Sequence, residues 1–231
     1  MRDDRYLNEA EGRRRALQRC LRLLSQYTNG PPGHLLDVGC SAGIFLTLAS
    51  EAGWSVFGVE PSDWLSARAR SRFGARVLST SFEKAAFRRQ SFDAITFWDV
   101  LEHLADPVGS VNKAAHLVRP GGVLALNVPN IESAIARLMG YRWPLLLPEH
   151  IFYFSRRALQ MLLEQHGFAP LGFHLHPVFF NVGYVLDRPA QHDVPGVGPI
   201  GKILRTMGLQ DRSIPLLVGE LIAVGRRRSP E

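Results

Sequence analysis

The chain has 231 residues, of which 46% are hydrophobic, and its formal net charge is +6. A chain of this length can bury one sizeable core, since single cores stop growing only beyond about 250 to 300 residues. It contains no apolar run of about 18 residues, which a membrane-spanning helix needs, and its first 15 residues are too polar for a secretory signal. We therefore expect a single domain over residues 1–231, located in the cytoplasm and without an integral membrane segment.

The N-terminal segment predicts an amphipathic helix. Leu17, Leu21 and Leu24 recur at helical spacing. Between them lie the basic residues Arg13, Arg14, Arg15, Arg19 and Arg22. Between residues 13 and 24 no aromatic residues alternate with these arginines, as a surface that stacks on nucleic-acid bases would need. We interpret residues 1–33 as a helical cover with a solvated basic face, and expect no nucleic-acid partner.

Apolar runs of strand length then alternate with helical patterns. The runs lie at residues 34–39, 55–60, 75–80, 92–100 and 122–129, and 216–225 is a further, closing strand. Such alternation is typical of crossover units around a mostly parallel sheet. The sequence thus predicts an α/β fold, doubly wound, with helices on both faces of the sheet.

Two helices have clear end signals. Asp106 can cap a helix that has Pro107 at its first position and an apolar face of Val108, Val111, Ala115 and Val118, and the turn 119–122 would stop it. A second helix begins at Ser155, carries Leu159, Leu162 and Leu163 on one side, and ends at Gly167.

Two regions fit this alternation poorly. Residues 131–154 are dense in aromatics, and residues 187–201 form a loop rich in proline and glycine. Long loops in a compact domain are usually functional or mobile. Cys20 and Cys40 follow no metal or disulfide spacing, so we expect reduced thiols.

A glycine turn follows the first strand, in the stretch "HLLDVGCSAGIFL". Gly39 and Gly43 leave the backbone bare where open parallel sheets bind ligands. The spacing lacks the G-x-G-x-x-G pattern of dinucleotide sites. Glu60 ends the next strand, where a carboxylate can accept hydrogen bonds from both hydroxyls of a ribose. These residues favour a nucleoside-containing ligand over a dinucleotide.

Four motifs in order resemble the class I S-adenosylmethionine-dependent methyltransferases. They are "LLDVGCSAG", "VEPS", "FDAITFWDVLEHLADP" and "LVRPGGVLALNVPN", within residues 34–130. The stretch "HIFYFSRRALQMLLEQHGF" is similar to the small-molecule subgroup that includes the ubiquinone-pathway O-methyltransferases. The resemblance implies a Rossmann-like, seven-stranded sheet, S-adenosyl-L-methionine as cofactor, a cofactor-binding core at 34–130, an acceptor-side lid at 131–154 and a C-terminal part at 155–231.

The resemblance also implies the cofactor-binding residues. Asp37 would organise the turn or the donor's ammonium group, Glu60 would hold the ribose, and Asp99 would lie beside the methionine moiety. Ser81 and Phe82 would frame the adenine, with Glu83 as an alternative to Ser81. The full expected set is Asp37, Gly39, Cys40, Gly43, Glu60, Pro61, Ser81, Phe82 and Asp99.

Methyl transfer to a hydroxyl needs a base, and histidine has a suitable pKa. His103 follows the fourth strand, and His150 lies among Tyr141, Trp143, Phe152, Tyr153 and Phe154, which could form an apolar acceptor wall. His174, His176 and His192 show no comparable setting. No metal is expected, although Asp99, Glu102 and His103 resemble a divalent-metal set of some ubiquinone-pathway enzymes, and that question stays open.

We therefore predict a methyltransferase for a small-molecule acceptor, most plausibly a hydroxyl oxygen. One rival is an RNA or DNA methyltransferase. It is disfavoured because "DVLEHL" stands where exocyclic-amine enzymes of this fold carry an Asn/Asp-Pro-Pro-aromatic set. The other rival is a non-catalytic cofactor-binding module. Acceptor identity and oligomeric state are not predicted.

Overall fold

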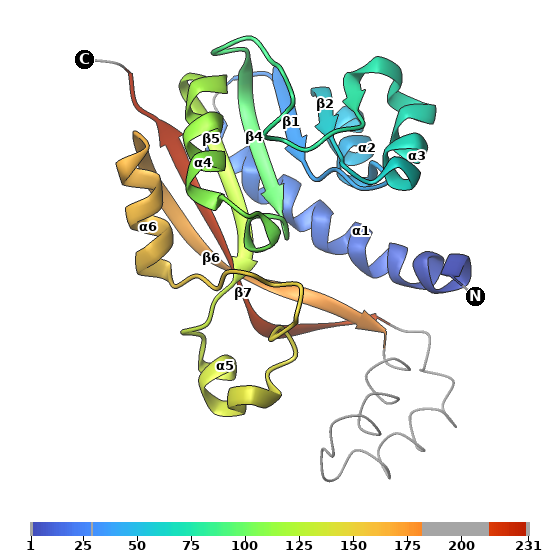
Figure 1. Cartoon of the computed structure of the whole chain (residues 1–231), viewed down its shortest axis with the longest axis vertical. Helices are drawn as coiled ribbons and strands as arrows, with labels where there is room; N and C mark the ends of the chain where they lie inside the picture. Colours follow the sequence, from blue (N-terminus) through green and yellow to red (C-terminus); the bar gives the residue numbers. More distant parts are fainter. Residues whose placement is uncertain (1, 29, 182–212, 230–231) are drawn as a thin grey trace.

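A computed structural model describes residues 2–28, 30–181 and 213–229. Its centre is a seven-stranded sheet of order β3-β2-β1-β4-β5-β7-β6 (Figure 1). The strands are β1 His34–Val38, β2 Ser55–Val59, β3 Val77–Leu78, β4 Phe92–Trp98, β5 Val118–Pro129, β6 Phe168–Asn181 and β7 Ser213–Arg227. Strands β1 to β5 pair in parallel, and β7 runs antiparallel to both β5 and β6. The predicted α/β fold with a mostly parallel sheet is confirmed.

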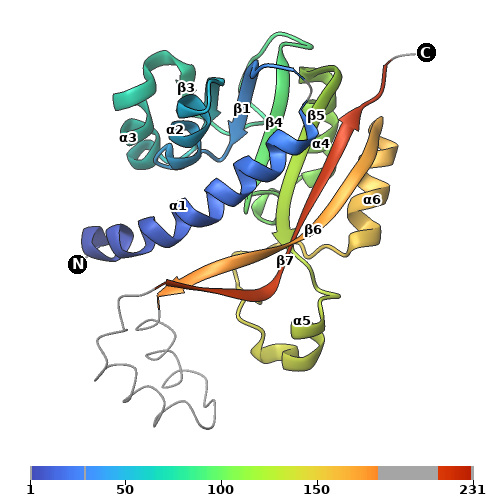
Figure 2. The same cartoon turned by 180° about the vertical axis from the view of Figure 1, so that it is seen from behind.

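Helices cover both faces of the sheet (Figures 1 and 2). The long α1 crosses one face beside α2, and α4 and α6 lie on the other face. The α-helices are α1 Arg2–Tyr27, α2 Ile44–Glu51, α3 Asp63–Phe73, α4 Pro107–Leu117, α5 Ala134–Met139 and α6 Arg156–Gln165. Short 3₁₀ turns are η1 Gly74–Arg76, η2 Leu101–His103 and η3 Gly140–Arg142. Each face buries its own apolar cluster.

The predicted end signals hold for α4 and α6. Asp106 accepts a hydrogen bond from the Gly109 amide at 2.8 Å, and Ser155 caps α6 by accepting one from Ala158 at 3.1 Å. The helix ends at Leu117, before residues 119–122, as predicted, and Val111 and Ala115 of the predicted face are buried. Two residues of that face were wrong. Val108 is 52% exposed, and Val118 begins β5, where it pairs with Phe92.

The strand predictions differ from the structure at two places. The predicted run 75–80 forms only a two-residue strand, because η1 occupies Gly74–Arg76. Strand β6 had no counterpart among the predicted strands, whereas the run 216–225 lies within β7 as expected. The loop 187–201 lies outside the described residues. Within the described ranges no helix is both long and apolar enough to cross a bilayer.

Candidate active site

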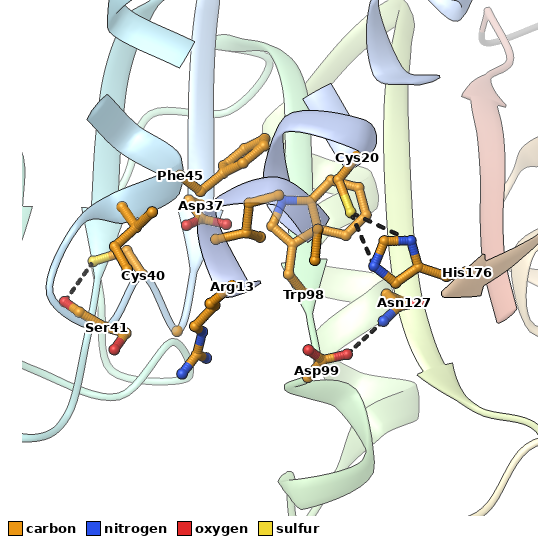
Figure 3. Close-up of a pocket in the computed structure, with 14 residues that line it drawn as sticks. Arg13, Cys20, Asp37, Cys40, Ser41, Phe45, Trp98, Asp99, Asn127 and His176 are labelled. Carbon is orange, nitrogen blue, oxygen red and sulfur yellow. Dashed lines mark hydrogen bonds between the residues drawn. The ribbon is translucent and has the colours of Figure 1, made fainter. Parts of the chain in front are cut away.

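A cavity lies under α1 at the carboxyl ends of β1, β4 and β5 (Figure 3). Its walls come from α1, β1 and the glycine turn after it, the end of β4 and the strands β5 and β6. The lining residues include Arg13 and Cys20 of α1, Asp37 on β1, Gly39, Cys40 and Ser41 of the turn, Trp98 and Asp99 at the end of β4, Asn127 on β5 and His176 on β6. Its volume is about 40 Å³, room for a few water molecules, and it is partly open to solvent. The fold therefore brings the glycine turn after β1 and the end of β4 together at one site.

The glycine turn has backbone geometry that favours residues without a Cβ. Gly39 has φ +69°, and a Cβ there would lie 2.5 Å from Val100 Cγ2. Gly43 has φ +83° and directly precedes α2. Ser41, between them, takes φ 52°, a left-handed conformation that is uncommon outside glycine and marks functional sites. The turn is held over β2 because the amides of Gly39 and Cys40 both donate to Val59 O, at 2.8 and 3.1 Å.

Glu60 ties the turn to the next helix. Its two carboxylate oxygens accept hydrogen bonds from the amides of Ser41 and Ser62, each at 2.9 Å. Ser62 is the N-cap of α3. A carboxylate oxygen has a second lone pair, so Glu60 can still accept hydrogen bonds from a ligand. Pro61 is exposed directly beside it.

Asp37 is buried at the end of β1 and accepts a hydrogen bond from Thr96 Oγ1 at 2.7 Å. Burial raises its pKa to about 7, opposed by the bond from Thr96 and by the charge of Arg13. A carboxyl group of this kind titrates near neutral pH, and a cationic ligand would favour its ionised form.

Three further residues of the expected cofactor-binding set are Phe82, Ser81 and Cys40. The Phe82 side chain packs edge-on against Phe97 inside the core, with ring centroids 5.5 Å apart, and its carbonyl accepts from Lys113 Nζ. Its side chain is therefore committed to the core. Ser81 precedes it and is half-buried. Cys40 lines the cavity and, like Cys20, is a free buried thiol.

Asp99 leaves β4 with φ 57°, a second strained position at the cavity. Its Oδ1 accepts a hydrogen bond from Asn127 Nδ2, which also donates to Glu220 Oε2 at 2.9 Å. Asn127 and Glu220 are buried, and burial together with the charge of Asp99 raises the pKa of Glu220. The side-chain amide of Asn127 is thus hydrogen-bonded to two acidic side chains, Asp99 and Glu220.

A second polar cluster lies on the other side of Asp99. Ligand atoms of Glu102, His103 and His150 lie within 4.8 Å of one another. His103 Nδ1 bonds to Glu149 O at 2.9 Å, and His150 Nδ1 bonds to Leu145 O at 2.8 Å, so each ring has its Nε2 left for another partner. Burial, followed by the charge of Asp99, raises the pKa of Glu102 to about 8, whereas burial lowers that of His150. These three side chains, without Asp99, are the described residues best arranged to hold a cation.

The loop that carries His150 is fixed to the protein by backbone contacts. The amides of Ile151 and Phe152 both donate to Glu102 O, at 2.9 and 3.1 Å. The predicted aromatic wall is only partly assembled. Trp143 is buried, with its Nε1 bonded to Val218 O at 2.6 Å, and Tyr153 lies near it and His150. Tyr141 is 80% exposed and packs against no such wall.

Sequence reasoning missed four residues of this site: Arg13, Asn127, His176 and Glu220. His176, for which the sequence showed no setting comparable to that of His103 and His150, lines the cavity. Asn127 and Glu220 carry a usable signal, since each is a polar residue inside an otherwise apolar strand. Arg13 was assigned to the solvated face of α1, and its place at the cavity depends on how α1 crosses the sheet.

The sheet order, the glycine turn after β1 and the acid after β2 define a Rossmann-like α/β protein with a nucleoside site at its switch point. A family model described as a methyltransferase domain matches residues 10–171, and the chain belongs to this family. It is an S-adenosylmethionine-dependent methyltransferase, with S-adenosylmethionine as its cofactor.

Relatives and solved structures agree with this family. The chain is 28% identical to the ubiquinone biosynthesis O-methyltransferase of Coxiella burnetii over 160 residues, which are 63% of this chain and 68% of that protein. Its identity to the Vibrio parahaemolyticus protein of the same name is also 28%, over 67% of this chain and 72% of that one. A Thermotoga maritima methyltransferase structure, described as a possible histamine N-methyltransferase, superposes with TM-score 0.62, 18% identity, and coverage of 98% and 95% of the two chains. The structural likeness supports the fold.

The residues present fit the cofactor. Gly39 lines the cavity with its backbone, and its φ of +69° and the contact that a Cβ would make with Val100 favour glycine there. Trp98 Nε1 is buried at the cavity without a hydrogen-bond partner among the described residues. Buried polar groups are nearly always paired, so this donor indicates a site that a ligand completes.

Proposed function

We propose that this enzyme methylates a small-molecule acceptor at a hydroxyl oxygen. The observation that carries the proposal is the pair of imidazoles beside Asp99. Their ring centroids lie 4.8 Å apart, and each Nδ1 is already bonded to a backbone carbonyl. If each Nδ1 carries the donated hydrogen, each Nε2 is an unprotonated acceptor when the ring is neutral, as a general base requires.

In this proposal each residue of the donor half has one role. Glu60 accepts hydrogen bonds from the ribose, Pro61 and Ser81 border the adenine, and Asp37 binds the ammonium group. Arg13 is the one basic side chain among the described lining residues, and it suits the donor's carboxylate. When bound, S-adenosylmethionine supplies an electrophilic methyl group carried on a sulfonium.

Under this proposal His150 takes the acceptor's proton. Its lowered pKa keeps the ring neutral at physiological pH, in the form that accepts a proton. His103 packs against it and is the alternative base. The loop 141–154 acts as a lid that excludes water, because its contacts to Glu102 place it at the same sheet edge.

Donor binding also involves α1 in this proposal. Arg13, Leu17 and Cys20 of this helix line the cavity. Since α1 forms one wall, we expect it to shift outward when donor binds and to exchange amide hydrogens more slowly once donor and acceptor are both present.

Transfer of a labelled methyl group tests the proposal. The enzyme is incubated with methyl-labelled S-adenosylmethionine and matched phenols, alcohols, amines and thiols, and labelled product and S-adenosylhomocysteine are quantified. Label in the ethers of hydroxyl compounds is expected. Label confined to amines, thiols or added RNA would contradict it.

A further inference from the structure

The side chain of Asn127 has one hydrogen-bonding atom left over. Its exposed fraction is 1%, and its Nδ2 donates to Asp99 Oδ1 and Glu220 Oε2. An amide nitrogen carries two hydrogens, so both are used. Asn127 Oδ1 is buried and has no partner within the described part of the chain, although Asn127 lines the cavity. This oxygen can only accept, so its missing partner must be a hydrogen-bond donor.

Asp99 and His176 line the cavity beside Asn127, and Glu220 pairs with His176 across β6 and β7. Two basic side chains act on this region from α1, Arg19 on His176 and Arg13 on Glu220. Burial lowers the pKa of His176, whose ring lies 3.8 Å from Cys20 Sγ. Figure 3 shows Arg13 on the side of Ser41 and Asp37, with Asn127 and His176 beyond Trp98. The surroundings therefore offer hydrogen-bond acceptors, and Asp99, which is bonded to Asn127, disfavours an anion there.

The strand order places these residues on the acceptor side. The glycine turn and Glu60 follow β1 and β2, whereas Asn127 lies on β5, and β4 with Asp99 runs between them. A ligand that uses the glycine turn for its methionine end reaches Asp99 first and Asn127 beyond it. Asn127 thus lies on the side of the cavity away from the glycine turn, where we expect the group that receives the methyl.

We propose that Asn127, Asp99 and His176 form the acceptor subsite, in which Asn127 Oδ1 accepts a hydrogen bond from an uncharged hydroxyl group of the acceptor. The same subsite disfavours acceptors that carry a carboxylate or phosphate at this end. This inference rests on the proposed function. It adds that the reacting end of the acceptor is an uncharged hydroxyl group and that Asn127 binds it.

Four small probes test the subsite on the enzyme saturated with S-adenosylhomocysteine. Phenol has the hydroxyl, fluorobenzene is a close isostere without the hydrogen, benzoate is anionic and benzylamine is cationic. Affinities come from calorimetry or ligand-observed NMR. We expect phenol to bind at least about tenfold tighter than fluorobenzene and benzoate, as one buried hydrogen bond predicts. Equal affinities, tighter benzoate or tighter benzylamine would each overturn the proposal.

A matched pair of variants assigns the effect to Asn127. Asn127→Leu should lower phenol affinity at least about tenfold, while Asn112→Leu, the same change at an exposed position on α4, should leave it unchanged. Unchanged phenol affinity in folded Asn127→Leu contradicts the assignment. If Asn127→Leu does not fold, because Asp99 and Glu220 lose their shared donor, the four-probe comparison on the wild-type enzyme decides alone.

The affinity for S-adenosylhomocysteine separates this inference from the proposed function. If the wild-type enzyme does not bind S-adenosylhomocysteine, both the proposed donor site and the proposed function are contradicted. Tight binding of S-adenosylhomocysteine together with no preference for phenol would overturn the acceptor subsite only.

Discussion

The donor and acceptor halves that we propose for the site are built in different ways. In the donor half, Asp37, Gly39 and Glu60 belong to β1, β2 and the turns that follow them directly, and Glu60 holds the turn through backbone amides. In the acceptor half, Asn127 and His150 come from distant segments, and His150 is held by a loop bonded to η2. Local motifs can specify the first arrangement, whereas tertiary packing alone assembles the second.

The largest expected effect lies in the acceptor half. His150→Ala should lower turnover about a hundredfold, the usual scale of general-base catalysis, and leave donor affinity intact. His166→Ala is the matched control, because His166 makes the same Nδ1 bond to a carbonyl, Leu162 O at 2.8 Å, on α6. Steady-state kinetics with an identified acceptor measures both. Wild-type turnover in His150→Ala would make this residue structural and transfer the role to His103 or solvent.

A chelator distinguishes a base from a metal ligand at the same cluster. If Glu102, His103 and His150 act without an ion, then turnover is unchanged after treatment with EDTA. Activity lost to EDTA and restored by a divalent cation would show that the three side chains hold a metal, contrary to the sequence prediction.

The next effect lies in the donor half. Glu60→Gln should weaken donor binding roughly tenfold or more, since a charge-assisted bond to the ribose is lost. The amide NH₂ of glutamine would also face the amide of Ser41 or Ser62, which needs an acceptor. Calorimetry with S-adenosylhomocysteine measures this, with the exposed Glu164→Gln on α6 as control. Unaltered affinity in a folded Glu60→Gln would place the ribose elsewhere.

Asp37 should make donor binding depend on pH. Its pKa is about 7 in the ligand-free protein, and an ammonium group binds its ionised form. Affinity should therefore rise as pH increases through this value, by up to about tenfold per pH unit below it, and level off above it. Asp37→Asn keeps an acceptor for Thr96 but should bind more weakly at high pH and lose the slope. A slope that persists in this variant would assign the titration to another group.

The smallest expected effect concerns the basic face of α1. Filter binding of RNA and DNA over a salt series should detect no specific complex, because only proteins that track phosphates lose affinity steeply with salt. A steep salt dependence that disappears when Arg15 and Arg22 are both changed to glutamine would instead support a nucleic-acid partner.

The sequence predicted those parts of the fold and of the proposed site that are formed by residues close together in the chain. The alternating pattern predicted the sheet, and the motif around Gly39 together with Glu60 led to the donor half, because turn conformation and strand ends are local properties. It could not place Asn127 or His176, since their meeting depends on β7 inserting between β5 and β6. Phe82 shows the converse, because its motif position suggested a ligand contact while packing against Phe97 commits the side chain to the core.

Calorimetric titration of the wild-type enzyme with S-adenosylhomocysteine, S-adenosylmethionine and NAD most directly tests the central claim, that the glycine turn and Glu60 form a site for the methyl donor. We expect saturable binding of the first two and none of NAD, with a matching rise in melting temperature. Binding of NAD alone would contradict it.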